Sequence, residues 1–201
     1  PKLARRCLQR QPHGGTQRSM DTCITTRAGT RVEILNLGNF LLDGGTMFGR
    51  VPKVMWERWF PADPLNRITM ATNVMRFEKD GLVHVVETGL GTRYAARDWE
   101  IMGTSPAAVR VLADPVDRLI LTHLHWDHCG GVQEMDIRQE VVVSRAEWED
   151  AHGATPLSKG SYRAADLEAI AGRLCLVDGR LEIAPGVEVI PTPGHTRGHM
   201  S

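Results

Sequence analysis

The chain has 201 residues, the size of one ordinary domain or of the larger part of a somewhat bigger one. Its 24 Lys and Arg residues balance its 24 Asp and Glu residues, and this neutral balance argues against a wholesale nucleic-acid binder. A hydrophobic share of 42% and a charged share of 24% exclude collagen-like and disordered chains, and the longest apolar runs fall far short of the roughly 20 residues that a membrane helix needs. We therefore expect a soluble globular protein that binds neither nucleic acid nor membrane.

Charge is uneven along the chain. Residues 1–19 contain five basic residues and no acidic one, so residues 20–201 carry a net charge of −5. The basic residues are Lys2, Arg5, Arg6, Arg10 and Arg18. No apolar core follows the arginine pair, which argues against a secretory signal peptide. We expect residues 1–19 to be a disordered head, with upstream translated sequence as one interpretation and Met20 as a natural start, and residues 20–201 to form the domain.

The first half of the chain is rich in predicted strands. Apolar and polar residues alternate over Arg31–Leu37, and the segment Asn39–Leu42 ends in the turn signal Asp43-Gly44-Gly45, so two strands are predicted. A hairpin is predicted over Ile68–Phe77 and Leu82–Val86, because Gly81 lies in the turn between them and tolerates a positive φ.

The intervening segment, residues 46–67, is predicted to be long and irregular because three prolines punctuate it. It contains the large apolar residues Met47, Phe48, Trp56, Trp59 and Phe60. Two interpretations remain open: these side chains form an apolar wall that accepts an acyl chain, or they pack a long loop onto a sheet.

Beyond residue 100, predicted helices and strands alternate. Ser105 and Pro106 suit the N-cap and the first position of a helix that runs to about Ala113. Further helices are expected over Arg145–His152 and Ser161–Leu174. Strands are expected over Arg118–Leu121, Glu140–Val143, Cys175–Val177, Arg180–Ile183 and Val187–Ile190. Strands first, then helix and strand in alternation, are typical of a layered α/β protein with mixed sheets.

Histidine is concentrated in two short windows. Five of the eight histidines lie within residues 123–128 and 195–199, where an even spread would place about 0.4. The first window, THLHWDH from Thr122, directly follows an apolar strand, at the strand end where α/β folds place their sites. In an extended segment, residues two apart point to the same side, so His123 and His125 can hold one ion together.

Asp127 and His128 follow as the chain turns, and they can face a second ion. A carboxylate beside imidazoles suits zinc, and also manganese, iron or cobalt. Structural histidines are the alternative interpretation, but four specified residues within six positions make a chance match rare.

The second window, PGHTRGH, also follows a predicted strand. Pro193 and Gly194 force a tight turn that presents His195 at the strand end. His195 would complete a set of three imidazoles for the first ion, whereas His199 is expected to support or pack against the site rather than bind metal.

The four cysteines, Cys7, Cys23, Cys129 and Cys175, are far apart and form no C-x-x-C pair. A reduced, cytoplasmic protein is therefore the default expectation. Cys129 stands next to His128, and we expect it to be a small buried apolar residue rather than a ligand or a reactive thiol.

The motifs THLHWDH and PGHTRGH, in this order and at this separation, resemble those of the metallo-β-lactamase-fold hydrolases. Within that superfamily, the stretches DGGTMFGRVPKVMW and PADPLNRI resemble a branch that includes quorum-quenching N-acyl-homoserine-lactone lactonases. The resemblance covers roughly Arg31 to Ser201. It implies an α/β fold, the αββα sandwich, of which the chain holds the N-terminal half and the start of the C-terminal half, with a dinuclear metal site at one edge of the two sheets.

The resemblance also implies a ligand set. One metal would be held by His123, His125 and His195, and the other by Asp127 and His128. Two divalent metal ions are therefore the expected cofactors, with zinc as the first choice and manganese, iron or cobalt as alternatives.

Two departures from the family pattern stand out. Glu87-Thr88-Gly89 replaces the usual Asp-Thr-Gly turn, whose aspartate is thought to brace the metal site, so the role of Glu87 is left open. The family also supplies a metal-bridging Asp and a last His ligand from a C-terminal half that begins about here, yet the sequence ends two residues after His199. We therefore expect a C-terminally truncated fragment.

The predicted function is hydrolysis of a small-molecule lactone or carboxylic ester, such as an N-acyl-homoserine lactone. Two divalent ions that share a hydroxide create a nucleophile and polarise the substrate carbonyl, and Asp127 is the candidate to carry a proton to the leaving alkoxide. The alternatives are a glyoxalase II-type thioesterase, a β-lactamase or a phosphodiesterase on the same site, or an inactive metal-binding fragment. Diiron redox chemistry is disfavoured, because such proteins place a Glu where this chain has His125. A homodimer stays open.

Overall fold

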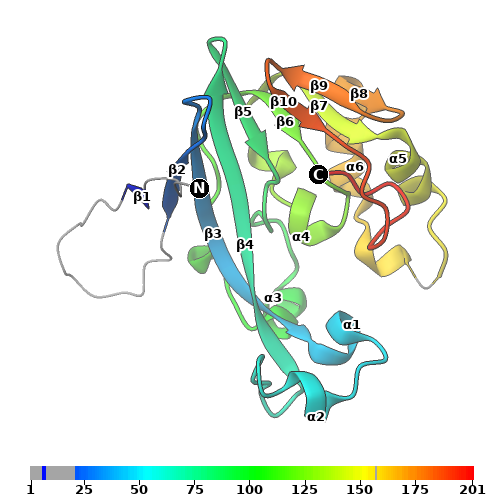
Figure 1. Ribbon diagram of the computed structural model, residues 1–201. Helices are drawn as coiled ribbons and strands as arrows, with labels where there is room; N and C mark the ends of the chain where they lie inside the picture. Colours follow the sequence, from blue (N-terminus) through cyan, green and yellow to red (C-terminus); the bar gives the residue numbers. More distant parts are fainter. Residues whose placement is uncertain (1–5, 8–20, 157) are drawn as a thin grey trace.

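A computed structural model describes residues 6–7, 21–156 and 158–201, and its main feature is one large sheet (Figure 1). Its eight strands lie side by side in chain order. They are β1 (Arg6–Cys7), β2 (Thr22–Thr25), β3 (Arg31–Asp43), β4 (Arg67–Lys79), β5 (Leu82–Val86), β6 (Val116–Ile120), β7 (Ile137–Ser144) and β8 (Leu174–Val177). The long strands β3 and β4 extend well past their neighbours and carry the helices α1 (Gly44–Phe48) and α2 (Lys53–Trp56) at their far end (Figure 1).

The sheet changes from antiparallel to parallel at β5. Neighbouring strands from β1 to β5 pair antiparallel, whereas β5 to β8 pair parallel. Parallel neighbours require crossover connections, and these contain the remaining helices. They are the α-helices α3 (Ala96–Met102), α4 (Trp126–Cys129), α5 (Arg145–His152) and α6 (Ala164–Ile170), and the 3₁₀ helices η1 (Pro106–Ala108), η2 (Val132–Glu134), η3 (Lys159–Ser161) and η4 (Ala171–Arg173).

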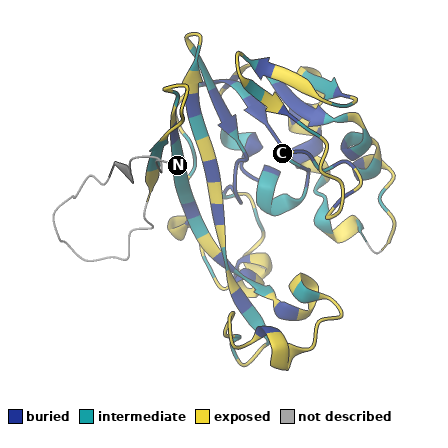
Figure 2. Cartoon of the chain, in the orientation of Figure 1, coloured by how far each residue is buried: buried dark blue, intermediate teal, exposed yellow. Residues whose placement is uncertain are grey.

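The two faces of the sheet pack against different layers. Leu119, Val141 and Val143 pack in one core cluster with residues of α5 and α6. Ile120 and Val142 point to the opposite face, where they pack with the hairpin of β9 (Leu181–Ala184) and β10 (Val187–Val189). The central strands are consequently buried on both sides (Figure 2). Helices on one face and the start of a second sheet on the other confirm the predicted α/β fold class, that of the αββα sandwich.

Several predicted elements are present as expected. The turn between β4 and β5 places Asp80 at φ 52° and Gly81 at φ 76°, and α5 spans the predicted residues. The two strands predicted around residue 38 are one strand, β3, in which the pairing with β4 shifts register between Asn36 and Asn39.

Two expectations are wrong. The helix expected from Ser105 is only the single turn η1, because the chain is extended at Val109 and the next N–H, of Arg110, donates to the carbonyl of Leu37 at 2.6 Å. The segment 46–67 is not wholly irregular, since it contains most of α1 and all of α2.

The predicted basic head lies outside the described residues except for Arg6 and Cys7, which form β1 against β2. Within the described part of the chain, no helix is both long enough and apolar enough to cross a bilayer.

The loop after α4 has no room for a side chain at Gly130. A Cβ at this position would collide with the carbonyl oxygens of Leu90 and Trp126. We predict that Gly130→Ala lowers the free energy of unfolding by about 1–3 kcal/mol in urea titrations. Gly172→Ala is the matched control, because its Cβ would meet no atom within 4 Å. Equal stability of the two variants would contradict the close approach of the end of α4 to the backbone at Leu90.

Candidate metal centre

Two histidines lie in an extended loop directly after β6. Leu121 and Leu124 are fully buried and anchor this loop in the core. His123 and His125 flank Leu124 and lie close together, with ring centroids 4.6 Å apart. This is the arrangement that the i, i+2 spacing predicts.

His195 reaches the same place from a separate loop after β10. The N–H of Met200 donates to the carbonyl of Thr122 at 3.0 Å, which fastens this loop to the end of β6. His195 Nε2 lies 3.1 Å from His125 Nδ1, and the centroids of the His195 and His123 rings are 4.9 Å apart. One ring nitrogen from each of the three histidines lies within 4.8 Å of the others, close enough for all three to bind one ion.

The environment of His123 fits a metal ligand. Its Nδ1 is 2.9 Å from the hydroxyl of Thr122, while its Nε2 is buried and has no hydrogen-bond partner among the described residues. Burial, followed by the neighbouring His128 and His125, lowers the pKa of His123 to about 2, so the ring is neutral. A buried nitrogen lone pair without a donor is costly unless a cation binds it.

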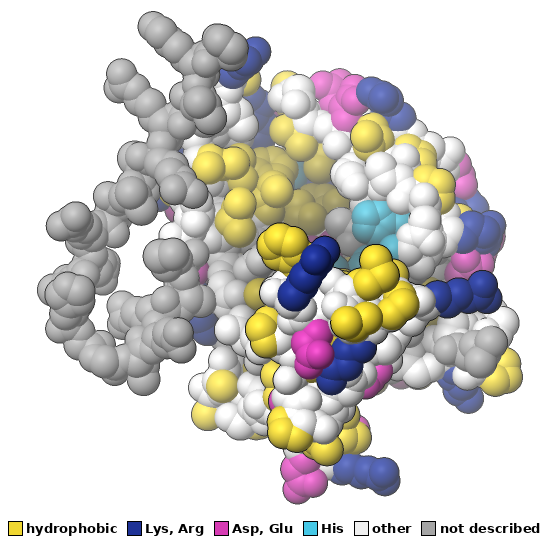
Figure 3. All heavy atoms as spheres, turned by 60° about the horizontal axis from the view of Figure 1, so that its bottom comes forward, with side chains coloured by type: hydrophobic (Ala, Val, Ile, Leu, Met, Phe, Trp, Pro, Cys, Tyr) yellow, Lys and Arg dark blue, Asp and Glu magenta, His cyan; other side chains and the backbone are white. Residues whose placement is uncertain are grey.

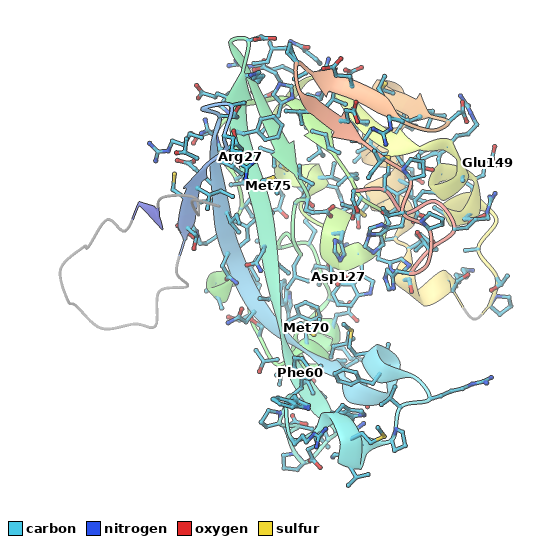
Figure 4. All side chains as sticks on the ribbon, viewed as in Figure 1. Arg27, Phe60, Met70, Met75, Asp127 and Glu149 are labelled. Atoms are coloured by element: carbon cyan, nitrogen blue, oxygen red, sulfur yellow. The ribbon has the colours of Figure 1, made fainter. Side chains whose placement is uncertain are left out.

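Asp127 and His128 lie next to the three-histidine cluster on the short helix α4. His128 Nε2 is 3.6 Å from Asp127 Oδ2, and the centroid of its ring is 4.0 Å from that of His123. Figure 4 shows Asp127 between β4 and the loop that carries the C-terminal histidines. These two side chains offer an imidazole and a carboxylate for a second ion.

Glu87 connects α4 to the loop after β6 by hydrogen bonds to both. Its Oε2 lies 2.8 Å from His128 Nδ1, and its Oε1 accepts the backbone N–H of Thr122 at 2.8 Å. Burial disfavours the charged form of His128, but the hydrogen bond and the negative charge of Glu87 outweigh it and raise the pKa. With Nδ1 engaged by the carboxylate, Nε2 is left to face a metal. The role that the sequence left open is therefore a bracing role, performed by Glu in place of Asp.

Glu147, on α5, is a further residue of the site that sequence reasoning missed. Its carboxylate is fully buried and accepts hydrogen bonds from the N–H of Leu124 and from the hydroxyl of Thr196. The only sequence signal was Ser144-x-x-Glu147, a pattern that normally indicates a helix N-cap.

Three other residues near the cluster, His199, Cys129 and Tyr162, interact with other parts of the protein. His199 Nδ1 lies 2.9 Å from the hydroxyl of Thr192, and its ring centroid is 5.3 Å from that of His123, outside the three-histidine cluster. Cys129 is buried, and burial raises the pKa of its thiol, as expected for a small apolar residue. Tyr162 packs edge-on against His125, and burial, reinforced by the charge of Glu147, raises its pKa to about 12.

The apolar residues of segment 46–67 divide into two groups. Trp56 is buried and stacks on Phe48 at 4.7 Å, and Phe48 also contacts Phe60 at 5.3 Å. Met47 and Trp59 are exposed, the latter by 71%. Figure 3 shows a hollow lined by apolar side chains, with histidine at its edge. The packing interpretation therefore fits Trp56, and an apolar wall stays open for the exposed residues.

The family model of the metallo-beta-lactamase superfamily matches residues 68–201, well over half of the chain. The chain belongs to the metallo-beta-lactamase superfamily. Its two histidine motifs and the strands β5 to β10 lie within the matched region, whereas β1 to β3 and the helices α1 and α2 precede it.

Curated relatives agree with the branch that the sequence resembles. An N-acyl homoserine lactonase of a Bacillus species is 38% identical over 96 residues, which are 46% of this chain and 35% of the relative. The N-acyl homoserine lactonase AiiA of Bacillus thuringiensis subsp. kurstaki is 36% identical over 96 residues, with the same coverage. The aligned region thus spans about a third of the length of these relatives.

Solved structures show the same fold. A probable metal-dependent hydrolase from Staphylococcus aureus superposes with a TM-score of 0.73 at 26% identity, covering 84% of this chain and 66% of that one. AidC, a dizinc quorum-quenching lactonase, superposes with a TM-score of 0.61 at 19% identity, covering 85% and 66%. At that identity the likeness to AidC shows the fold alone.

The hydrogen bond between Glu87 and His128 leads to a prediction about zinc affinity. Glu87→Ala removes the partner of His128 Nδ1 and frees the ring to rotate, so we expect the affinity for zinc, measured by calorimetric titration, to fall about 10–100-fold. Glu188→Ala, which removes an exposed acid on β10, should bind zinc like the unmodified chain. Unchanged zinc affinity in Glu87→Ala would show that Glu87 does not brace a ligand.

Proposed function

We propose that this superfamily member is a metal-dependent hydrolase that opens a lactone or another carboxylic ester, with N-acyl-homoserine lactones as the substrate class. The observation that carries the proposal is the cluster of His123, His125 and His195 around the unpartnered, buried Nε2 of His123. The lactonase relatives at 36–38% identity support the substrate class.

The geometry supports an assignment of the metal ligands. His123, His125 and His195 would hold one divalent ion, and Asp127 and His128 would contribute to a second. Zinc is the proposed metal, because neutral imidazoles with a carboxylate suit it and because one solved neighbour is a dizinc enzyme.

Bound metal ions and the side chains of this chain would contribute different parts of the hydrolysis. Bound divalent ions lower the pKa of a coordinated water toward neutrality and polarise a carbonyl. Asp127 lies beside His128 with its carboxylate only partly exposed, so its Oδ atoms can accept a proton and return it to the leaving alkoxide oxygen. Burial lowers the pKa of His123 and of His125, so these two rings are neutral and their lone pairs are available.

Other hydrolyses remain candidates for the same ligand set. A thioester or a β-lactam also presents a polarisable carbonyl, and only a substrate panel separates these from a lactone. The inactive metal-binding fragment stays an alternative, because the chain spans about two thirds of the solved structures that it matches.

The test combines metal content with turnover. We expect the chain to retain at least one zinc ion after dialysis and to hydrolyse an N-acyl-homoserine lactone faster than a thioester or a β-lactam. His123→Ala should lose the metal, and Asp127→Asn should lower kcat by at least 100-fold with the fold intact.

His152→Ala is the matched control, because His152 is an exposed histidine that hydrogen-bonds to the carbonyl of Trp148 and lies outside the cluster. Metal binding without hydrolysis of any lactone would contradict the enzymatic proposal for this chain. Equal metal content in His123→Ala and His152→Ala would contradict the proposed ligands.

A further inference from the structure

Glu147 is the carboxylate that joins the two histidine motifs. Its Oε1 accepts the N–H of Leu124 at 3.0 Å, between the first two histidines, and its Oε2 accepts the hydroxyl of Thr196 at 2.5 Å, directly after His195. The hydroxyl of Tyr162 adds a longer contact of 3.4 Å to Oε1. All three partners are donors, which suits an ionised carboxylate that can only accept.

The hydrogen bonds of the Glu147 carboxylate are not those of an ordinary helix cap. Glu147 stands three residues after the N-cap Ser144, whose hydroxyl accepts the Glu147 N–H at 3.4 Å. In a capping box the glutamate would bond back to the N-cap backbone, but here both oxygens bond to the histidine loops instead. A buried carboxylate without a cation is costly, and charge-assisted hydrogen bonds to these loops are its compensation.

Backbone contact reinforces the same junction. A Cβ at Gly198 would collide with the backbone nitrogen of Glu147, so the C-terminal loop rests directly on the first turn of α5. The loop that carries His195 is therefore fixed to α5 by its backbone at Gly198 and by its side chain at Thr196. The loop that carries His125 is fixed to the same residue through Leu124.

We propose that Glu147 is a positioning residue that sets the distance between His125 and His195 and thereby the affinity of the three-histidine cluster for a metal ion. The inference rests on the proposed metal-binding function. It assigns the preorganisation of the cluster to one buried acid that binds no metal itself. The two loops follow different strands, β6 and β10, and Glu147 bonds to both, so loss of this acid should loosen the cluster before it unfolds the protein.

The test measures Co²⁺ binding by visible absorption, whose ligand-field bands report both affinity and coordination geometry. Glu147→Gln removes the charge at nearly constant volume, and Thr196→Val removes the hydroxyl donor without touching a ligand. We expect each to raise the dissociation constant for Co²⁺ at least tenfold and to alter the bands. Thr196→Ser keeps the hydroxyl and should restore the affinity.

Asp166→Asn is the matched control. Asp166 is equally buried but bonds to Gln133 and pairs with Arg163, away from both histidine loops. Urea unfolding of the metal-free variants then separates stability from positioning: Asp166→Asn should lose stability and still bind Co²⁺ within twofold of the unmodified chain.

Two results would overturn the inference about Glu147 and leave the proposed metal site standing. One is an unchanged Co²⁺ affinity in Thr196→Val. The other is a loss of affinity in Asp166→Asn as large as that in Glu147→Gln, at matched stability. If Glu147→Gln does not fold, the Thr196 pair of variants decides. Absence of Co²⁺ binding by the unmodified chain would instead refute the proposed metal site, and the inference would fall with it.

Discussion

Three imidazole rings share one corner of this protein, and protonated rings at this separation would repel each other. Burial is the largest cause that lowers the pKa of His123 to about 2 and that of His125 to about 4. A neutral imidazole presents a lone pair, so the crowding that excludes protons favours a metal cation in their place. Hydrogen bonds from the surrounding elements hold the loop that carries His123 and His125 in place.

The residues that hold or carry the rings follow successive strands of the parallel half of the sheet. Glu87 follows β5, His123 and His125 follow β6, and Glu147 lies in the first turn of α5, the helix after β7. The carboxyl ends of neighbouring parallel strands lie at one edge of a sheet, which is why Glu87 and Glu147, 60 positions apart, both bond to the loop after β6. The two acids bond to the ring nitrogen or the backbone of the histidine loops, and so they fix orientation as well as charge.

Local sequence signals predicted what depends on local chemistry. The i, i+2 histidines follow from their spacing, the Asp80-Gly81 turn from the tolerance of Gly81 for a positive φ, and the helix α5 from the helical composition of its residues, and each is present. What the sequence could not predict depends on contacts between distant segments. The helix expected after Ser105 ends early because Leu37, far away in sequence, takes the N–H of Arg110. Glu147 was missed for the same reason, since its partners lie 23 and 49 residues away.

The most direct test of the three-histidine metal site is a crystal structure of the zinc-loaded chain with anomalous scattering recorded at the zinc edge. We expect an anomalous peak bonded to His123, His125 and His195, with Glu147 and Glu87 behind the ligands and not bound to the metal. A zinc ion held by other residues, or no peak among these three histidines, would contradict it.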